Sequence, residues 1–206
     1  MPTLTNIHDH FPPIPTDNST FNLFIDNLNK GFIEADEKLF KDFELKVIHQ
    51  YIKNSHELYV NCFLPKMDHS LIQLEEVLTI NELGAPALFA FFKGFKKELI
   101  HHIILEDSII IRYTENYLLG LENHLNFKRI LIDFLNTHAD TILLDLDKIF
   151  SVFEDAYPHL IENLPYRVFK SQFTLFQNHL SIHHFIEDEV YVRKIMFETD
   201  LHFYDN

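Results

Sequence analysis

Two short segments of the chain place a histidine four residues before a glutamate. One segment runs from His102 to Glu106, and the other lies about eighty residues later, from His183 to Glu187. Residues four apart in an α-helix lie one turn apart on the same face. Imidazole nitrogen and carboxylate oxygen both bind transition metals. The repeat therefore predicts a metal site to which two helices each contribute one His–Glu pair.

Two more histidines, His56 and His138, lie in the middle of the apolar stripes of two other helical segments. Four imidazoles and two carboxylates are too many for one tetrahedral zinc but suit two ions bridged by the glutamates. Burying two glutamates without a positive partner costs several kcal/mol, and metal cations compensate directly. Because the set contains no thiolate, we expect two iron ions with an oxo or hydroxo bridge, and manganese as second choice.

The phase of each helix separates the two histidines of each adjacent pair. Neighbouring residues in a helix point about 100° apart. His102 and His183 share the apolar stripes of their segments, so His101 and His184 point elsewhere. His184 and Asp188 are also four residues apart, like the two His–Glu pairs. They do not lie on the apolar stripe of their segment, so we do not expect them to be ligands.

The elements that must position these residues are read from helical periodicity. It predicts a short helix at about 20–30 and four long helical segments at about 43–78, 87–113, 124–153 and 166–197, with a kink at Pro65. The sequence has only 4 Gly and 8 Pro, which argues against a β fold with many reversals. We expect an all-α protein: a leader over residues 1–42, then an antiparallel up-down four-helix bundle over residues 43–200.

Composition excludes several other classes of protein. The formal net charge is -14, with 31 acidic and 17 basic residues and no basic stripe, so neither nucleic acid nor an anionic membrane surface is an expected partner. Cys62 is the single cysteine, which excludes an intrachain disulfide and a cluster held by several thiolates. No secretory signal or membrane-spanning run is visible, and we expect a cytoplasmic location.

The order of these motifs resembles the hemerythrin-like HHE cation-binding domain. The two long motifs are His102-x-x-x-Glu106-Asp107-x-Ile109 and His183-x-x-x-Glu187-Asp188-x-Val190-x-x-Arg193. The shorter ones are Tyr51-Ile52-Lys53-Asn54-Ser55-His56 followed by Leu64-Pro65, and His138-Ala139-Asp140. The similarity covers residues 43–194 and is greatest to the di-iron proteins credited with repair of iron–sulfur clusters.

The resemblance implies a non-haem di-iron centre in which four histidines are terminal ligands and two glutamates are bridges: His56, His102, His138, His183, Glu106 and Glu187. It also implies a role in oxidative or nitrosative stress, with O2, NO or peroxide as small-molecule partners and damaged iron–sulfur proteins as substrates. Hemerythrins that store or sense O2 or NO use the same ligands, and this second function stays open at the sequence level, as do enzymatic turnover and the oligomeric state.

Two departures from the family pattern bear on the site. Repair proteins usually carry another histidine at the end of the first helix, where this chain reads Val77-Leu78-Thr79-Ile80. One ion then lacks a protein ligand unless His179 or His69 replaces it. The family's cysteine-containing N-terminal segment also has no counterpart in residues 1–42. A metal-free helical interaction protein, with histidines that only pack, is the remaining alternative.

Overall fold

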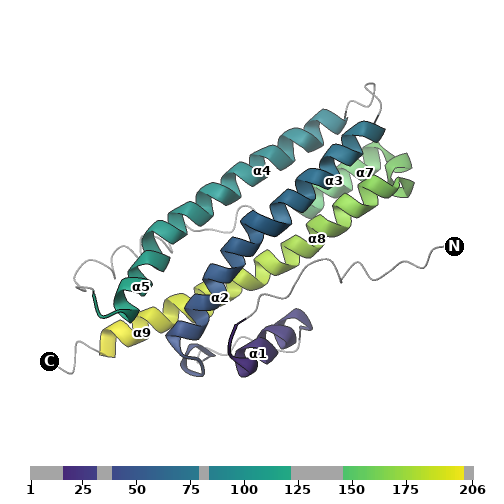
Figure 1. Cartoon of the computed structure of the whole chain (residues 1–206). Coiled ribbons are helices and arrows are strands. Elements are labelled where there is room, and N and C mark those ends of the chain that lie inside the picture. The colour runs from purple at the N-terminus through teal and green to yellow at the C-terminus, as the bar shows by residue number, and fades with distance from the viewer. Residues whose placement is uncertain (1–15, 32–38, 79–83, 122–145, 202–206) are drawn as a thin grey trace. The chain divides into compact units, whose positions relative to one another are not determined.

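The computed structural model describes residues 16–31, 39–78, 84–121 and 146–201, and every regular element in these ranges is helical (Figure 1). The all-α class expected from the sequence is therefore correct for the described residues. None of the described helices combines the length and the apolar character that crossing a membrane requires. Most of the third predicted segment, and with it His138, lies outside the described residues, so the antiparallel four-helix order remains a prediction.

Short 3-10 and π-helical segments lie between several of the α-helices. In chain order the elements are α1 (Ser19–Asn29), η2 (Leu39–Lys41), α2 (Leu45–Leu58), η3 (Tyr59–Phe63), α3 (Leu64–Val77), α4 (Gly84–Glu106), η4 (Asp107–Ile111), α5 (Arg112–Leu118), α7 (Leu146–Ala156), η5 (Pro158–Glu162), α8 (Leu164–Phe185), η6 (Ile186–Val192) and α9 (Arg193–Leu201). Of these connecting segments, η3, η4 and η6 are π-helical, and η2 and η5 are 3-10 helices.

The first predicted segment is helical from α2 through η3 to α3, and the disturbance expected at Pro65 appears as a π-helical turn just before it. Proline has no backbone N–H, and its ring crowds the carbonyl four residues earlier. The wider turn of η3 accommodates this, and the N–H of Leu64 bonds the carbonyl of Tyr59, five residues back.

The end of α5 is fixed by a glycine in the left-handed region of backbone conformation. Gly120 has φ +68°, which a residue with a Cβ adopts at a cost. Its N–H bonds the Tyr117 carbonyl at 2.9 Å, and the N–H of Leu121 bonds the Asn116 carbonyl at 2.8 Å. These two bonds form a Schellman cap, so the helical run from α4 continues about five residues beyond its predicted end at residue 113.

Residue contacts divide the chain into two compact units. Of the described residues, 57–78, 84–102 and 146–178 belong to the first unit. The second unit contains 16–31, 39–56, 103–121 and 179–201. The division falls inside α2, α4 and α8, so each of these helices contributes residues to both units.

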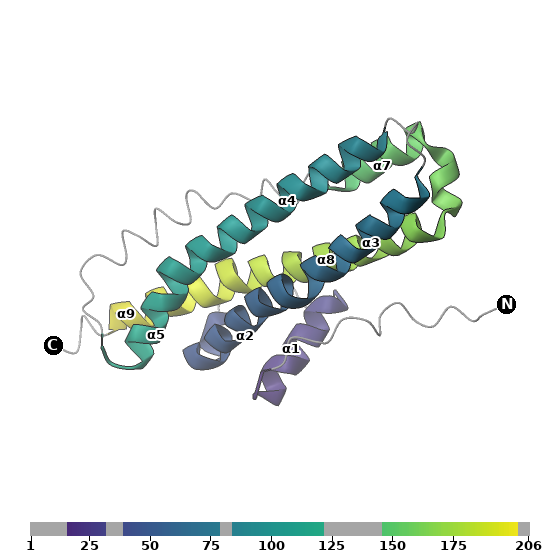
Figure 2. The ribbon, with the colours of Figure 1, turned by 45° about the horizontal axis from the view of Figure 1, so that its top comes forward.

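The first unit has an aromatic core between α4, α7 and α8, three helices that Figure 2 labels. Phe92 and Phe95 of α4 lie with ring centroids 6.2 and 5.3 Å from that of Phe173 on α8. Phe150 of α7 is 5.4 Å from the same ring. All four side chains are buried. These phenylalanine rings therefore form the core of the first unit.

In the second unit, α1 lies beside α2 (Figures 1 and 2). Phe21 of α1 is fully buried, with its ring edge-on to Tyr51 of α2 at 5.6 Å and to Phe43 at 4.8 Å. Asn18 caps α1, since its side-chain oxygen accepts the N–H of Phe21 at 2.9 Å. The short helix predicted at 20–30 is thus present and packed.

Replacing Phe173 by alanine should lower the free energy of unfolding by about 3–5 kcal/mol, because the ring is fully buried and leaves a cavity. Leu164→Ala, at a side chain that is 66% exposed, is the control and should change it by about 0.5 kcal/mol or less. Urea denaturation followed by circular dichroism measures both, and equal losses would contradict the core assignment.

Candidate metal site

Four potential metal ligands from three helical runs are buried in the second unit. They are His56 of α2, Glu106 at the end of α4, His183 of α8 and Glu187 of η6, each 3% exposed or less. One ligand atom from each of His56, Glu106 and His183 lies within 4.8 Å of the others. These buried residues can hold a metal ion.

The distances show which atoms converge. Nε2 of His56 lies 2.9 Å from Oε2 of Glu106 and 3.3 Å from Nε2 of His183. Nε2 of His183 lies 3.6 Å from Oε2 of Glu187, one turn further along the same helical run. Two imidazole nitrogens and two carboxylates therefore meet around one small volume.

The second nitrogen of each imidazole is held by a hydrogen-bond partner. Nδ1 of His56 lies 2.8 Å from Oδ1 of Asp107, and an ionised carboxylate only accepts, so Nδ1–H donates. Nδ1 of His183 lies 2.7 Å from Oγ of Ser55, whose hydroxyl donates to the Ile52 carbonyl at 2.6 Å. The Ser55 oxygen is therefore the acceptor for His183. Nδ1 of both rings therefore carries hydrogen, and each ring directs Nε2 to the shared volume.

This arrangement requires a positive charge between the ligands. Two lone pairs at 3.3 Å repel each other, and the carboxylates add negative charge where burial has removed water. Without a metal, protons must supply the charge. Burial lowers the pKa of His56, but the hydrogen bonds to Asp107 and Glu106 outweigh it and bring the pKa to about 9. Burial, with Glu106 and Asp188 nearby, raises the pKa of Glu187 well above its usual value.

π-Helical segments contain or lie close to the candidate ligand positions. The segment η4 begins directly after Glu106, η6 contains Glu187, and η3 begins three residues after His56. π-Turns inside α-helices occur frequently at functional sites, and each extra residue changes which side chains face inward. In η6 three consecutive residues are buried, Val190, Tyr191 and Val192, which a regular helix on a surface would not allow.

The neighbouring histidines follow the phases expected from the sequence. His101 is exposed, whereas His102 is half-buried on α4, one turn before Glu106. His102 is also the last residue of the first unit, and His138 lies outside the described residues. His184 is half-buried beside the fully buried His183.

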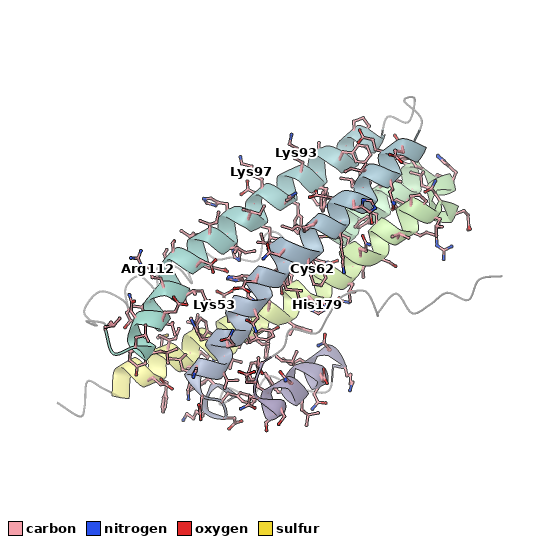
Figure 3. All side chains as sticks on the ribbon, in the orientation of Figure 1. Lys53, Cys62, Lys93, Lys97, Arg112 and His179 are labelled. Carbon is pink, nitrogen blue, oxygen red and sulfur yellow. The ribbon has the colours of Figure 1, made fainter. Side chains whose placement is uncertain are left out.

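The two candidates for a replacement ligand have different surroundings. His69 is exposed on α3 and lies 3.1 Å from the Gln73 side-chain nitrogen. His179 is half-buried on α8, one turn before His183, where Figure 3 labels it. Burial lowers the pKa of His179, which keeps the ring neutral and able to accept a proton or an ion.

Sequence reasoning missed the residues that surround the ligands. Ser55 precedes His56 and Asp107 follows Glu106, so adjacency was the signal available for both. His49 lies seven residues before His56, two turns away on the same face of α2. Nδ1 of this buried imidazole is 2.7 Å from the hydroxyl of Tyr191 on η6.

Compared with protein-family models, with curated proteins and with solved structures, the chain matches none of them. The resemblance to the hemerythrin-like HHE domain therefore depends on the quoted motifs alone. The structure adds the convergence of His56, Glu106 and His183, and the proximity of Glu187 to His183.

The buried His49 should make the protein less stable in acid. Burial lowers the pKa of His49 from 6.5 to about 4. Between pH 6.5 and 4 the unfolded chain takes up a proton that the folded chain does not, so the free energy of unfolding falls by up to about 3 kcal/mol. Urea unfolding at pH 7 and pH 4.5 measures this change. The free energy of unfolding should fall less between the two pH values in His49→Gln than in the wild type. His69→Gln, at an exposed position, is the control and should keep the wild-type slope.

Proposed function

We propose that this chain is a non-haem di-iron protein that acts in oxidative or nitrosative stress defence, by repairing damaged iron–sulfur clusters. One observation carries the metal-binding part: the Nε2 atoms of His56 and His183 face each other at 3.3 Å, both buried, beside Glu106. His102 and His138, together with Glu187, are the further proposed ligands, and an antiparallel four-helix bundle is the proposed frame. The repair function rests on the family resemblance of the motifs.

The donor set supports iron, with manganese as the alternative. Imidazole nitrogens and carboxylate oxygens without thiolate suit iron, manganese or zinc, and two glutamates reduce the charge of a pair of divalent ions. Bound iron would supply one-electron chemistry toward O2, NO or peroxide. The protein's part is to hold the imidazoles by Asp107 and Ser55 and to exclude water by burial.

Burial favours a second candidate function, the reversible binding of O2 or NO for storage or sensing. The four ligands of the second unit are at most 3% exposed, which suits diatomic molecules better than direct contact with a protein surface. Reversible formation of an oxy charge-transfer band would identify this function. Irreversible oxidation by O2, followed by loss of iron to a damaged cluster protein, would identify repair.

The central experiment combines metal analysis with a functional assay. The chain is purified after iron-replete expression, and its metal content and absorption spectrum are measured with and without NO. We expect about two irons per chain and a spectral change on NO binding. The loaded protein should then restore activity to an iron–sulfur enzyme inactivated by NO. A protein that retains no iron would contradict the proposal. A protein that binds iron but does not restore the activity of the inactivated enzyme would favour the second candidate function, reversible binding of O2 or NO.

Alanine variants test the ligands individually. Glu106→Ala, His183→Ala and His102→Ala should each lower the bound metal and the melting temperature of the loaded protein, because metal binding stabilises the folded state. The matched controls are His184→Ala and His101→Ala, each next to a proposed ligand but out of phase with it. Unchanged metal content in the first three variants, measured by elemental analysis, would refute the ligand assignment.

The residues that orient the imidazoles should also matter. Asp107→Ala and Ser55→Ala remove the acceptors for Nδ1 of His56 and His183, and should weaken metal affinity by about 10–100-fold. Ser108→Ala is the control, since that exposed hydroxyl donates to the carbonyl of Leu105 in the same helical run. Competition with a chromophoric chelator measures the affinities, and equal values for all three variants would exclude a role for these hydrogen bonds.

A further inference from the structure

A second pair of buried polar side chains lies in the same unit but outside the ligand cluster. The hydroxyl of Tyr191, on η6, is 2.7 Å from Nδ1 of His49, on α2. Tyr191 is fully buried and His49 is 6% exposed. Packing alone would not require a polar side chain at either buried position. The hydrogen bond between the two side chains compensates for the loss of water around their polar atoms.

The other side of the imidazole determines which atom donates. Nε2 of His49 lies 3.8 Å from Oε1 of Glu115, and the same carboxylate oxygen is 2.5 Å from Nζ of Lys53. The hydrogen bond from Lys53 lowers the pKa of Glu115, which is therefore ionised at neutral pH. A lone pair on Nε2 would face this negative charge, so the hydrogen lies on Nε2. Nδ1 is then the acceptor, and the phenol of Tyr191 donates to it.

The surroundings couple any oxidation of this phenol to loss of its proton. Burial raises the pKa of Tyr191 above its usual value, so the phenolate does not form at neutral pH. A phenol that loses one electron becomes a far stronger acid than an imidazolium. His49 is neutral, because burial lowers its pKa to about 4, and it is already in position to take the proton.

We propose that Tyr191 and His49 form a proton-coupled one-electron redox pair. One electron leaves the phenol for a one-electron oxidant, the O–H bond of Tyr191 breaks, and the proton moves to Nδ1 of His49. The products are a neutral tyrosyl radical and an imidazolium, whose Nε2–H faces the Glu115 carboxylate. One electron from a reductant and the return of the same proton restore the starting state.

The position of the pair suggests where its electron would be used. Tyr191 follows Glu187 by one helical turn on η6, and His49 precedes His56 by two turns on α2. Delivery of this electron to a metal held by the ligand cluster rests on the proposed function. The redox chemistry of the pair does not, since it involves only groups of the chain and an added oxidant.

The test uses the full chain after removal of metal with a chelator. A photogenerated ruthenium(III) polypyridyl complex serves as the one-electron oxidant, and electron paramagnetic resonance detects tyrosyl radicals. We expect a long-lived neutral radical in the wild type, because a buried radical cannot couple with another chain as surface radicals do. The radical should form more slowly in D2O, since a proton moves in the same step.

Three variants make the result specific. Tyr191→Phe should lose the long-lived signal. His49→Gln keeps an acceptor for the phenol but cannot take its proton, so it should lose the signal and the D2O effect. Tyr51→Phe is the matched control, since Tyr51 is 1% exposed on α2 with no imidazole at hydrogen-bond distance among the described residues; it should behave as the wild type.

Circular dichroism and thermal melting confirm that each variant is folded. A wild type without a long-lived radical, or the same signal in Tyr191→Phe or His49→Gln, would overturn the proposal. Because no metal is present, this outcome is independent of whether the chain binds iron.

Discussion

The structure of the second unit depends on the burial of two imidazoles and two carboxylates close to one another. Groups of this kind prefer water, and removing them from it is favourable only when opposite charge or hydrogen bonds compensate. Here Asp107 and Ser55 compensate one side of each ring, which leaves the Nε2 lone pairs and the glutamate oxygens directed at one another. A cation at their centre would resolve the conflict, and protons on His56 and Glu187 can also do so. Replacing buried charged groups by apolar residues of equal volume is often neutral or stabilising, so packing alone does not require this polarity.

The candidate ligands lie on helical runs that each contain a π-helical turn. A regular α-helix presents one inward stripe, whereas an inserted residue lets consecutive side chains face inward. In η6 the consecutive residues Val190, Tyr191 and Val192 are all buried, and Tyr191 contacts His49. The same insertion at η3 accommodates Pro65, so a residue that interrupts hydrogen bonding is placed where the helix is already irregular. The π-helical turns interrupt the regular hydrogen bonding of the helices and change which side chains face the interior.

The two units have different interiors. The first is filled by phenylalanine rings of α4, α7 and α8, while the second combines apolar residues of α1 and α2 with the His–Glu cluster and the Tyr191–His49 pair. The buried ionisable groups of this cluster lie in the second unit. In the first unit, the burial of aromatic rings stabilises the fold. Two of the helices that enter both units, α4 and α8, carry buried phenylalanines in the first unit and candidate ligands in the second.

Periodicity alone predicted the helical class and the phase that buries His183 in preference to His184, because both follow from the 3.6-residue repeat within one helix. Spacing also predicted two His–Glu pairs, and the structure places Nε2 of His183 3.6 Å from Oε2 of Glu187. The hydrogen bonds to Asp107, Ser55 and Tyr191 could not be predicted, since each joins residues whose distance depends on how separate helices pack. The π-helical turns were missed for a related reason: local propensity does not reveal an inserted residue, and only the tertiary structure decides which side chains it turns inward.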